Sequence, residues 1–87
     1  MDIPTLTSDP IKWSTIELAS YLKTTDCKDF WPWLLSQSVD GRSFMLLPPA
    51  PELHTRMGFP WDAAVKIARH VAGVRLAYMK QYYANTS

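Results

Sequence analysis

The segment 58–83 is the longest uninterrupted periodic segment of the chain. Its apolar residues recur at intervals of three and four, which places their side chains on one face of a helix. We therefore expect one long C-terminal helix, against which the other segments pack. Either Pro60 lies in the first turn of this helix or Asp62 caps it. The expected apolar face consists of Trp61, Ala64, Val65, Ala68, Val71, Ala72, Leu76, Met79 and Tyr83.

The opposite face of this helix is charged. The free backbone N–H groups at the helix start, next to Trp61 and basic residues, form a surface able to receive acidic groups. The alternative interpretation is an ordinary solvated face. Gly73 also falls here, and because glycine costs a helix about 1 kcal/mol relative to alanine, we expect a close neighbour at this position. The face carries Asp62, Lys66, Arg69, Gly73 and Lys80.

Before this segment, Pro, Gly and Asp residues divide the chain into short helices. Ser14 and Glu17 form the pattern of a capping box, which marks the start of the first helix. A turn over 38–43 leads into a short apolar helix that two prolines end. The sequence shows no alternation typical of strands, so the predicted class is all-α. The five expected helices are 15–23, 30–37, 44–47, 52–57 and the long C-terminal helix.

Length and composition fit one small domain. With 87 residues, the chain can bury only a modest core. No apolar run approaches the roughly 18 residues of a membrane span, so we expect no contact with membranes. The single cysteine, Cys27, excludes an internal disulfide, fits a reducing compartment and is expected to be a small apolar filler. We expect an irregular N-terminal arm over 1–11, a domain over 12–83 and a flexible tail over 84–87.

The net charge of +1 is unevenly distributed along the chain. Residues 1–52 contain seven acids and four bases, which gives a net charge of −3. Residues 53–87 contain one acid and five bases, which gives +4. This pattern suits a domain that docks head to tail on a related domain better than one that coats nucleic acid.

The sequence contains no recognisable catalytic or metal-binding motif. Neither His54 nor His70 has a Cys or Asp at a spacing typical of a metal site. The glycine patterns of nucleotide-binding loops and the serine motif of hydrolases are also missing. We therefore predict no enzymatic activity, no cofactor and no metal ion.

Two motifs resemble those of the sterile alpha motif (SAM) domain family, and the resemblance covers nearly the whole of residues 11–83. The first motif is Val39-Asp40-Gly41, followed by the apolar run 44–47. The second matches the family at Met57, Gly58, Ala64, Lys66 and Ile67 and departs from it at Phe59, Trp61, Asp62 and Ala63. Further segments are similar to the Polycomb-group branch found in MBT-repeat proteins, in particular Scm-related proteins with four MBT repeats. These segments are 23–27, 65–66, 74–78 and 81–82.

The resemblance implies a five-helix bundle in a nuclear repressor, where it binds the SAM domain of another Polycomb-group protein, an Scm-like one. Such pairing would assemble repressive complexes on chromatin. In this family, an end-helix surface of one domain docks head to tail on a mid-loop surface of another. The alternative function is RNA binding through the basic start of the last helix, as in some SAM domains. The preferred interpretation predicts no direct contact with nucleic acid.

The family pattern also places two candidate surfaces on this sequence. Because Asp40 is expected to cap the third helix and Arg42 adds a positive charge beside it, we expect weak or no self-polymerisation. The predicted end-helix surface consists of Phe59, Trp61, Asp62, Ala63, Lys66, Arg69 and His70. The possible mid-loop surface consists of Asp40, Arg42, Ser43 and Glu52.

Overall fold

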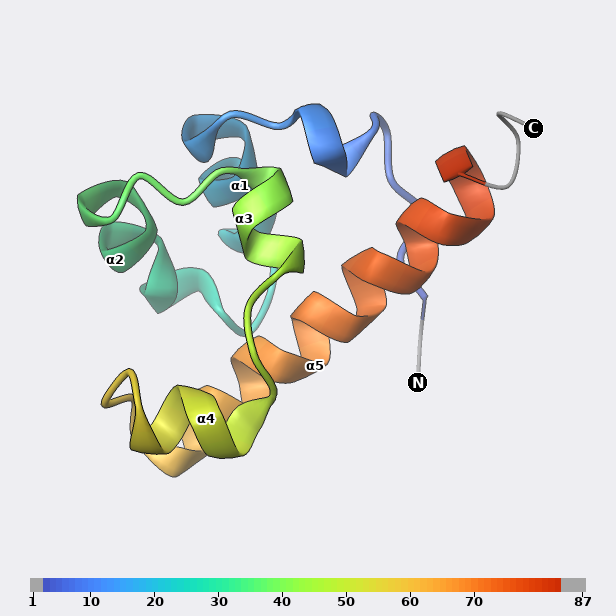
Figure 1. The fold of residues 1–87 in the computed structure, drawn as a ribbon. Coiled ribbons are helices and arrows are strands. Elements are labelled where there is room, and N and C mark those ends of the chain that lie inside the picture. The colour runs from blue at the N-terminus through green and yellow to red at the C-terminus, as the bar shows by residue number, and fades with distance from the viewer. Residues whose placement is uncertain (1–2, 84–87) are drawn as a thin grey trace.

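The computed structural model describes residues 3–83, and this range contains helices and no β-strand. This range contains five α-helices, of which the last is by far the longest (Figure 1). The predicted all-α class with a long C-terminal helix is therefore confirmed. The α-helices are α1 (Thr15–Leu22), α2 (Trp31–Ser36), α3 (Gly41–Met45), α4 (Ala50–Thr55) and α5 (Trp61–Tyr78). Three shorter helical segments complete the chain, namely η1 (Pro10–Lys12), η2 (Lys28–Phe30) and η3 (Met79–Tyr83).

The long helix α5 crosses the whole molecule, and the other elements pack along it (Figure 1). Helix α4 lies against its N-terminal half, while α1, α2 and α3 form a group on one side. The N-terminal arm lies beside η3, which continues α5 at its C-terminal end. There, the amide of Leu6 donates to Gln81 Oε1 at 3.0 Å, and Gln81 Nε2 donates to the carbonyl of Pro4 at 2.8 Å. The predicted tail over 84–87 lies outside the described residues.

The buried face of α5 differs from the expected one. The core receives Ile67 and Val74, which the predicted stripe omits, whereas Trp61, Leu76 and Met79 from that stripe are exposed. Two sets of three-and-four spacings run along this helix, and the structure uses the one whose side chains are small or branched. Gly73, predicted on the charged face, is also buried. The buried residues of α5 are Ala64, Ile67, Val71, Gly73, Val74 and Ala77.

Helix starts follow local side-chain chemistry. The predicted capping box is confirmed, because Glu17 N–H donates to Ser14 Oγ at 3.1 Å and Ser14 N–H donates to Glu17 Oε1 at 3.0 Å. The third helix was expected over 44–47 but covers Gly41–Met45. It begins earlier because Asp40 accepts a hydrogen bond from the amide of Ser43 at 2.8 Å and so caps the first turn.

The start of α5 corrects both alternatives drawn from the sequence. Pro60 is the N-cap residue and makes no side-chain capping hydrogen bond, and the helix begins at Trp61. Asp62 lies within the first turn, where its charge is favourable to the helix dipole. None of the helices in residues 3–83 combines the length and apolar character needed to cross a bilayer.

Candidate functional site

The N-terminus of α5 presents an aromatic side chain and no capping side chain. Trp61 is 52% exposed, and its ring meets that of His54 from α4 edge to face with centroids 5.8 Å apart. Pro60 leaves the first amide groups of the helix without a side-chain acceptor. This helix end can therefore receive an acidic group, with Trp61 beside it as an apolar contact.

Phe59, another residue of the predicted end-helix surface, mainly holds the chain in place. Its ring packs against Phe30 and Trp33, with centroids 5.2 and 5.1 Å away. Phe30 and Trp33 also stack on each other at 5.1 Å. This aromatic cluster joins the loop before α5 to η2 and α2. Ala63 is half-buried. The exposed residues of the predicted end-helix surface are Trp61, Asp62, Lys66 and Arg69.

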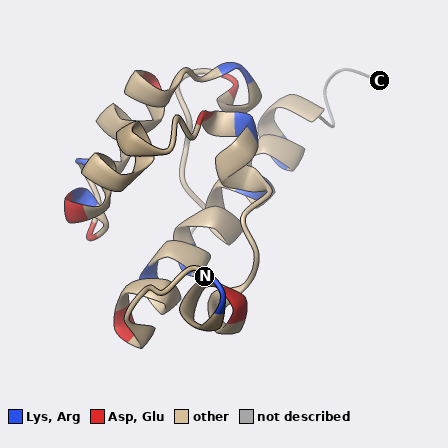
Figure 2. Cartoon of the chain, turned by 60° about the vertical axis from the view of Figure 1, so that its left-hand side comes forward, with Lys and Arg blue, Asp and Glu red and all other residues tan. Residues whose placement is uncertain are grey.

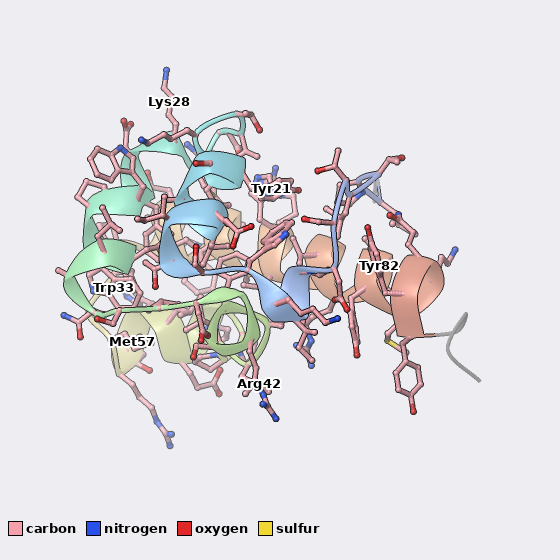
Figure 3. The ribbon with its side chains drawn as sticks, turned by 90° about the horizontal axis from the view of Figure 1, so that it is seen from above. Tyr21, Lys28, Trp33, Arg42, Met57 and Tyr82 are labelled. Carbon is pink, nitrogen blue, oxygen red and sulfur yellow. The ribbon has the colours of Figure 1, made fainter. Side chains whose placement is uncertain are left out.

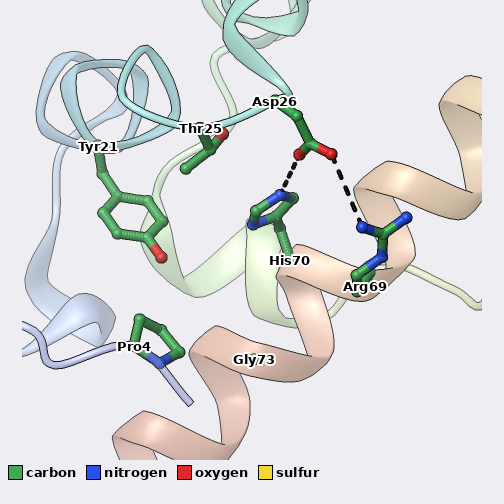
Figure 4. A pocket seen from close by; sticks show the side chains of 7 residues that line it. All are labelled: Pro4, Tyr21, Thr25, Asp26, Arg69, His70 and Gly73. Carbon is green, nitrogen blue, oxygen red and sulfur yellow. Dashed lines mark hydrogen bonds and ion pairs between the residues drawn. The ribbon is translucent and has the colours of Figure 1, made fainter. Parts of the chain in front are cut away.

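The basic side chains after this helix start meet an acid from a distant loop. His70 Nε2 lies 2.5 Å from Asp26 Oδ1, and Arg69 Nη1 lies 3.7 Å from Asp26 Oδ2 (Figure 4). The hydrogen bond with His70 lowers the pKa of the Asp26 carboxyl below its usual value, and the positive charges of His70, Arg69 and Lys66 act in the same direction. Two residues of the predicted surface therefore already have an acidic partner within the domain.

Asp26 is a site residue that the sequence did not reveal. It belongs to the loop between α1 and η2. Its partner His70, on α5, lies 44 positions later in the sequence. The loop is fixed by its own hydrogen bonds. The Thr25 hydroxyl donates to the carbonyl of Leu22 at 2.7 Å and accepts the amide of Cys27 at 3.0 Å. No local pattern could have signalled a contact made by tertiary packing across such a distance.

Cys27 lies next to this pair and is buried, with 6% of its surface exposed. Burial raises the pKa of its thiol to about 11, and the negative charge of Asp26 adds to the effect. A buried thiol with a raised pKa lacks the electropositive, partly exposed surroundings that activate a cysteine as a nucleophile. The structure thus agrees with the expectation that Cys27 fills an apolar position.

Two hollows flank the contact between Asp26 and α5. One, of about 560 Å³, is bounded by Tyr21, His70 and Gly73, with Pro4 of the N-terminal arm at its edge (Figure 4). The other, of about 310 Å³, lies over the aromatic cluster and is edged by charged side chains. These charged residues are Asp26, Asp29, Asp62 and Lys66.

The predicted mid-loop residues lie on two helices, α3 and α4. Asp40 caps α3, and its hydrogen bond with the amide of Ser43 lowers the pKa of its carboxyl. Arg42 and Ser43 are exposed. Glu52 on α4 is half-buried, and one of its carboxylate oxygens is buried without a hydrogen-bond partner. The carboxylate of Asp40 is therefore already occupied as the cap of α3.

The two candidate surfaces differ in the acids that surround them. Figure 3 shows Arg42 and Lys28 at opposite edges of the molecule, and Lys28 follows the loop that carries Asp26. Asp26 and Asp29 thus lie near the start of α5 and far from the predicted mid-loop residues. Basic residues recur along α5 itself, as Figure 2 shows.

Comparison with known proteins gives relatives of one kind. No model of a known protein family matches the chain. The proteins named Scm-like with four MBT domains protein 1 of Mus musculus and Homo sapiens are each 29% identical over 77 residues, which is 88% of this chain. The chain spans only 9% of the length of these relatives. Protein 2 of the same name from Mus musculus is also 29% identical over 77 residues.

Among solved structures, a polyhomeotic SAM domain superposes with a TM-score of 0.65. The match covers 79% of this chain and 99% of that domain, at 21% sequence identity. The fold match, the sequence relatives and the two SAM motifs agree. The chain therefore has the fold of a SAM domain, and its sequence is homologous to Scm-like proteins with four MBT domains.

Proposed function

We propose that this domain is a protein interaction module that binds the SAM domain of another protein head to tail. The observation that carries the proposal is the start of α5, where Pro60 provides no capping side chain and Trp61 is half-exposed. An acidic side chain of a partner can accept hydrogen bonds from the free amides while its neighbours cover the indole ring. The end-helix surface is then the binding side of the domain.

We further propose that the partner belongs to the Polycomb group and carries an Scm-like SAM domain. Its pairing with this domain would assemble repressive complexes on chromatin in the nucleus. The kinship with Scm-like proteins and the polyhomeotic fold support this assignment. Lys66 is exposed and forms no ion pair within the described residues, so it is the cation most available to the partner.

The test is charge reversal at the end-helix surface. The double variant Lys66→Glu, Arg69→Glu should lose binding to an Scm-like SAM domain in isothermal titration calorimetry, while its helical circular dichroism stays unchanged. The matched control is Lys80→Glu, an exposed lysine near the other end of the long helix, which should bind as the wild type does. Wild-type affinity in the double variant would refute the assignment of this surface. Single variants should show less, because one exposed pair contributes about 0.2 to 1 kcal/mol.

The mid-loop residues favour binding to a different partner over self-assembly. A second copy would bring its own Lys66 and Arg69 toward Arg42, and the nearby Asp40 is occupied as a helix cap. We therefore expect a monomer in light scattering at roughly 100 µM protein, a concentration that populates self-contacts with a binding free energy as small as about 5.5 kcal/mol. Arg42→Glu should introduce self-association, and growth of wild-type fibres would contradict the argument.

RNA binding is the competing outcome of these measurements. The helix start is basic, yet Asp62 lies in its first turn and Asp26 and Asp29 border the same hollow. These carboxylates repel a phosphate backbone. A shift assay with an RNA hairpin should therefore show no tight binding at physiological salt, and sub-micromolar binding there would replace the protein partner with RNA.

A further inference from the structure

A cysteine, a histidine and an aspartate come together where the loop after α1 touches α5. The Sγ atom of Cys27, a ring nitrogen of His70 and a carboxylate oxygen of Asp26 all lie within 4.8 Å of one another. We propose that these three side chains bind a divalent transition-metal ion, for which zinc is the best fit. This inference does not depend on the proposed partner, although one of the three ligands, His70, also belongs to the predicted end-helix surface.

The ligand types select zinc among the common ions. Zinc binds cysteine sulfur, histidine nitrogen and carboxylate oxygen, whereas magnesium and calcium prefer sites made of oxygen alone. In tetrahedral geometry, zinc bonds of about 2.0 to 2.3 Å place neighbouring ligand atoms roughly 3.3 to 3.7 Å apart. The pair of His70 Nε2 and Asp26 Oδ1, now 2.5 Å apart, must open by about 1 Å to admit the ion. Asp26 allows this movement because its side chain is at the surface.

The surrounding structure positions the three ligands. The hydrogen bond from the Cys27 amide to the Thr25 hydroxyl fixes the backbone that carries the sulfur. Arg69 contacts the second oxygen of Asp26, Oδ2, which leaves Oδ1 directed to the site. Partners of this kind orient metal ligands in known sites. Two residues of one hydrogen-bonded loop and one residue of a rigid helix thus form the site.

Charge and access also suit a divalent ion. On binding, the thiol of Cys27 releases its proton to solvent, so a thiolate and a carboxylate balance the two positive charges of the ion. This neutral complex makes the nearby Lys66 and Arg69 tolerable, although they would repel an uncompensated cation. Asp26 borders both of the hollows that flank the site, which gives the ion an entry path. A water molecule can take the fourth position from the same side.

The experiment uses cobalt(II) as a spectroscopic probe on the untagged domain. Cobalt bound by a thiolate in tetrahedral geometry produces strong visible bands and a sulfur-to-metal charge-transfer band, which zinc then removes by displacement. We expect both bands in the wild type. Cys27→Ala should lose the charge-transfer band, and His70→Gln should weaken binding. Arg69→Gln should weaken it by about 10-fold, as expected for a residue that positions a ligand.

The matched control is His54→Gln, which changes the other histidine of the chain and should leave the cobalt spectrum intact. Circular dichroism of each variant establishes that the helices are retained. If Cys27→Ala does not fold, His70→Gln decides the matter, because His70 is only partly buried. A wild-type protein that gives no charge-transfer band with excess cobalt overturns the proposal, and so does a His70→Gln variant that binds cobalt with wild-type affinity.

Discussion

Replacing Gly41 with alanine should destabilise the domain strongly, even though alanine is the better helix former. Gly41 opens α3, and its amide donates to the carbonyl of Trp13 at 3.0 Å. A Cβ atom at this position would lie 1.9 Å from the carbonyl oxygen of Pro10 and 2.9 Å from Trp13 Cβ. The closest of these contacts is to backbone, which cannot rotate away, so α3 and η1 must separate.

The magnitude follows from three effects. Alanine improves helix propensity by at most about 1 kcal/mol. Forcing atoms into a packed contact costs about 1 to 3 kcal/mol, and separating the elements loses the hydrogen bond from Gly41 to Trp13, worth about 1 kcal/mol. With the full gain in propensity subtracted, the net loss is about 1 to 3 kcal/mol. For a domain of this size it lowers the melting temperature by roughly 5 to 20 °C.

The assay is thermal and urea unfolding followed by circular dichroism. Arg42→Ala is the neighbouring control, because this exposed side chain should change stability by less than about 0.5 kcal/mol. Gly58→Ala is the second control. Gly58 has φ +80 and no atom within 4 Å of an added Cβ, so only the backbone conformation opposes alanine, at about 1 to 2 kcal/mol. A Gly41→Ala variant as stable as the wild type would refute the steric argument.

Three further predictions concern single side chains. Asp26→Asn should tighten partner binding in calorimetry because it frees Arg69. It should also lower the free energy of unfolding at neutral pH, by less than about 1 kcal/mol because the group is exposed, and with it the melting temperature. Because folding lowers the pKa of Asp26, this stabilisation is present above the ordinary value of 3.8 and disappears as the pH falls through the lowered value, so the two melting curves should converge in acid. Ser14→Ala should cost about 1 kcal/mol in urea unfolding, whereas Ser20→Ala on the exposed side of α1 should not. Trp61→Ala should weaken partner binding by more than about 1 kcal/mol with a modest loss of melting temperature. A variant that only loses stability, and that binds with wild-type affinity below its melting temperature, would contradict this role.

The features that sequence reasoning predicted correctly depend on neighbouring residues. The capping box of Ser14 and Glu17 lies within one turn, and the class of the fold follows from helical spacing and from the SAM motifs. The prediction of the buried face of α5 was wrong because Leu76 and Val74 are both apolar, and only the packing of α3, α4 and η1 against this helix selects between them. A local sequence pattern shows that a helix is present, but it does not show which face of the helix is buried.

In the candidate site, too, features that depend on neighbouring residues could be predicted, whereas contacts between distant segments could not. The sequence placed the start of α5 near Pro60, because Met57-Gly58 and Pro60 mark its boundary, but the predicted caps were wrong and Trp61 was also assigned to the apolar packing face. The contacts of Asp26 with Arg69 and His70 could not be predicted, since loop and helix meet only after the chain has folded. Residues outside the family motif thus decide how much of the basic charge on α5 is free for a partner.

The hydrogen bonds that join Leu6 to Gln81 and Tyr82 have a consequence for how the domain can be attached. They hold the first and last parts of the described chain side by side, at the far end of the long helix from Trp61. The 18 residues of α5 separate that end from the helix start by about 27 Å. A dye, a surface linker or a further domain attached at that end of α5 would therefore lie far from Trp61. Such an attachment would leave the proposed end-helix surface uncovered.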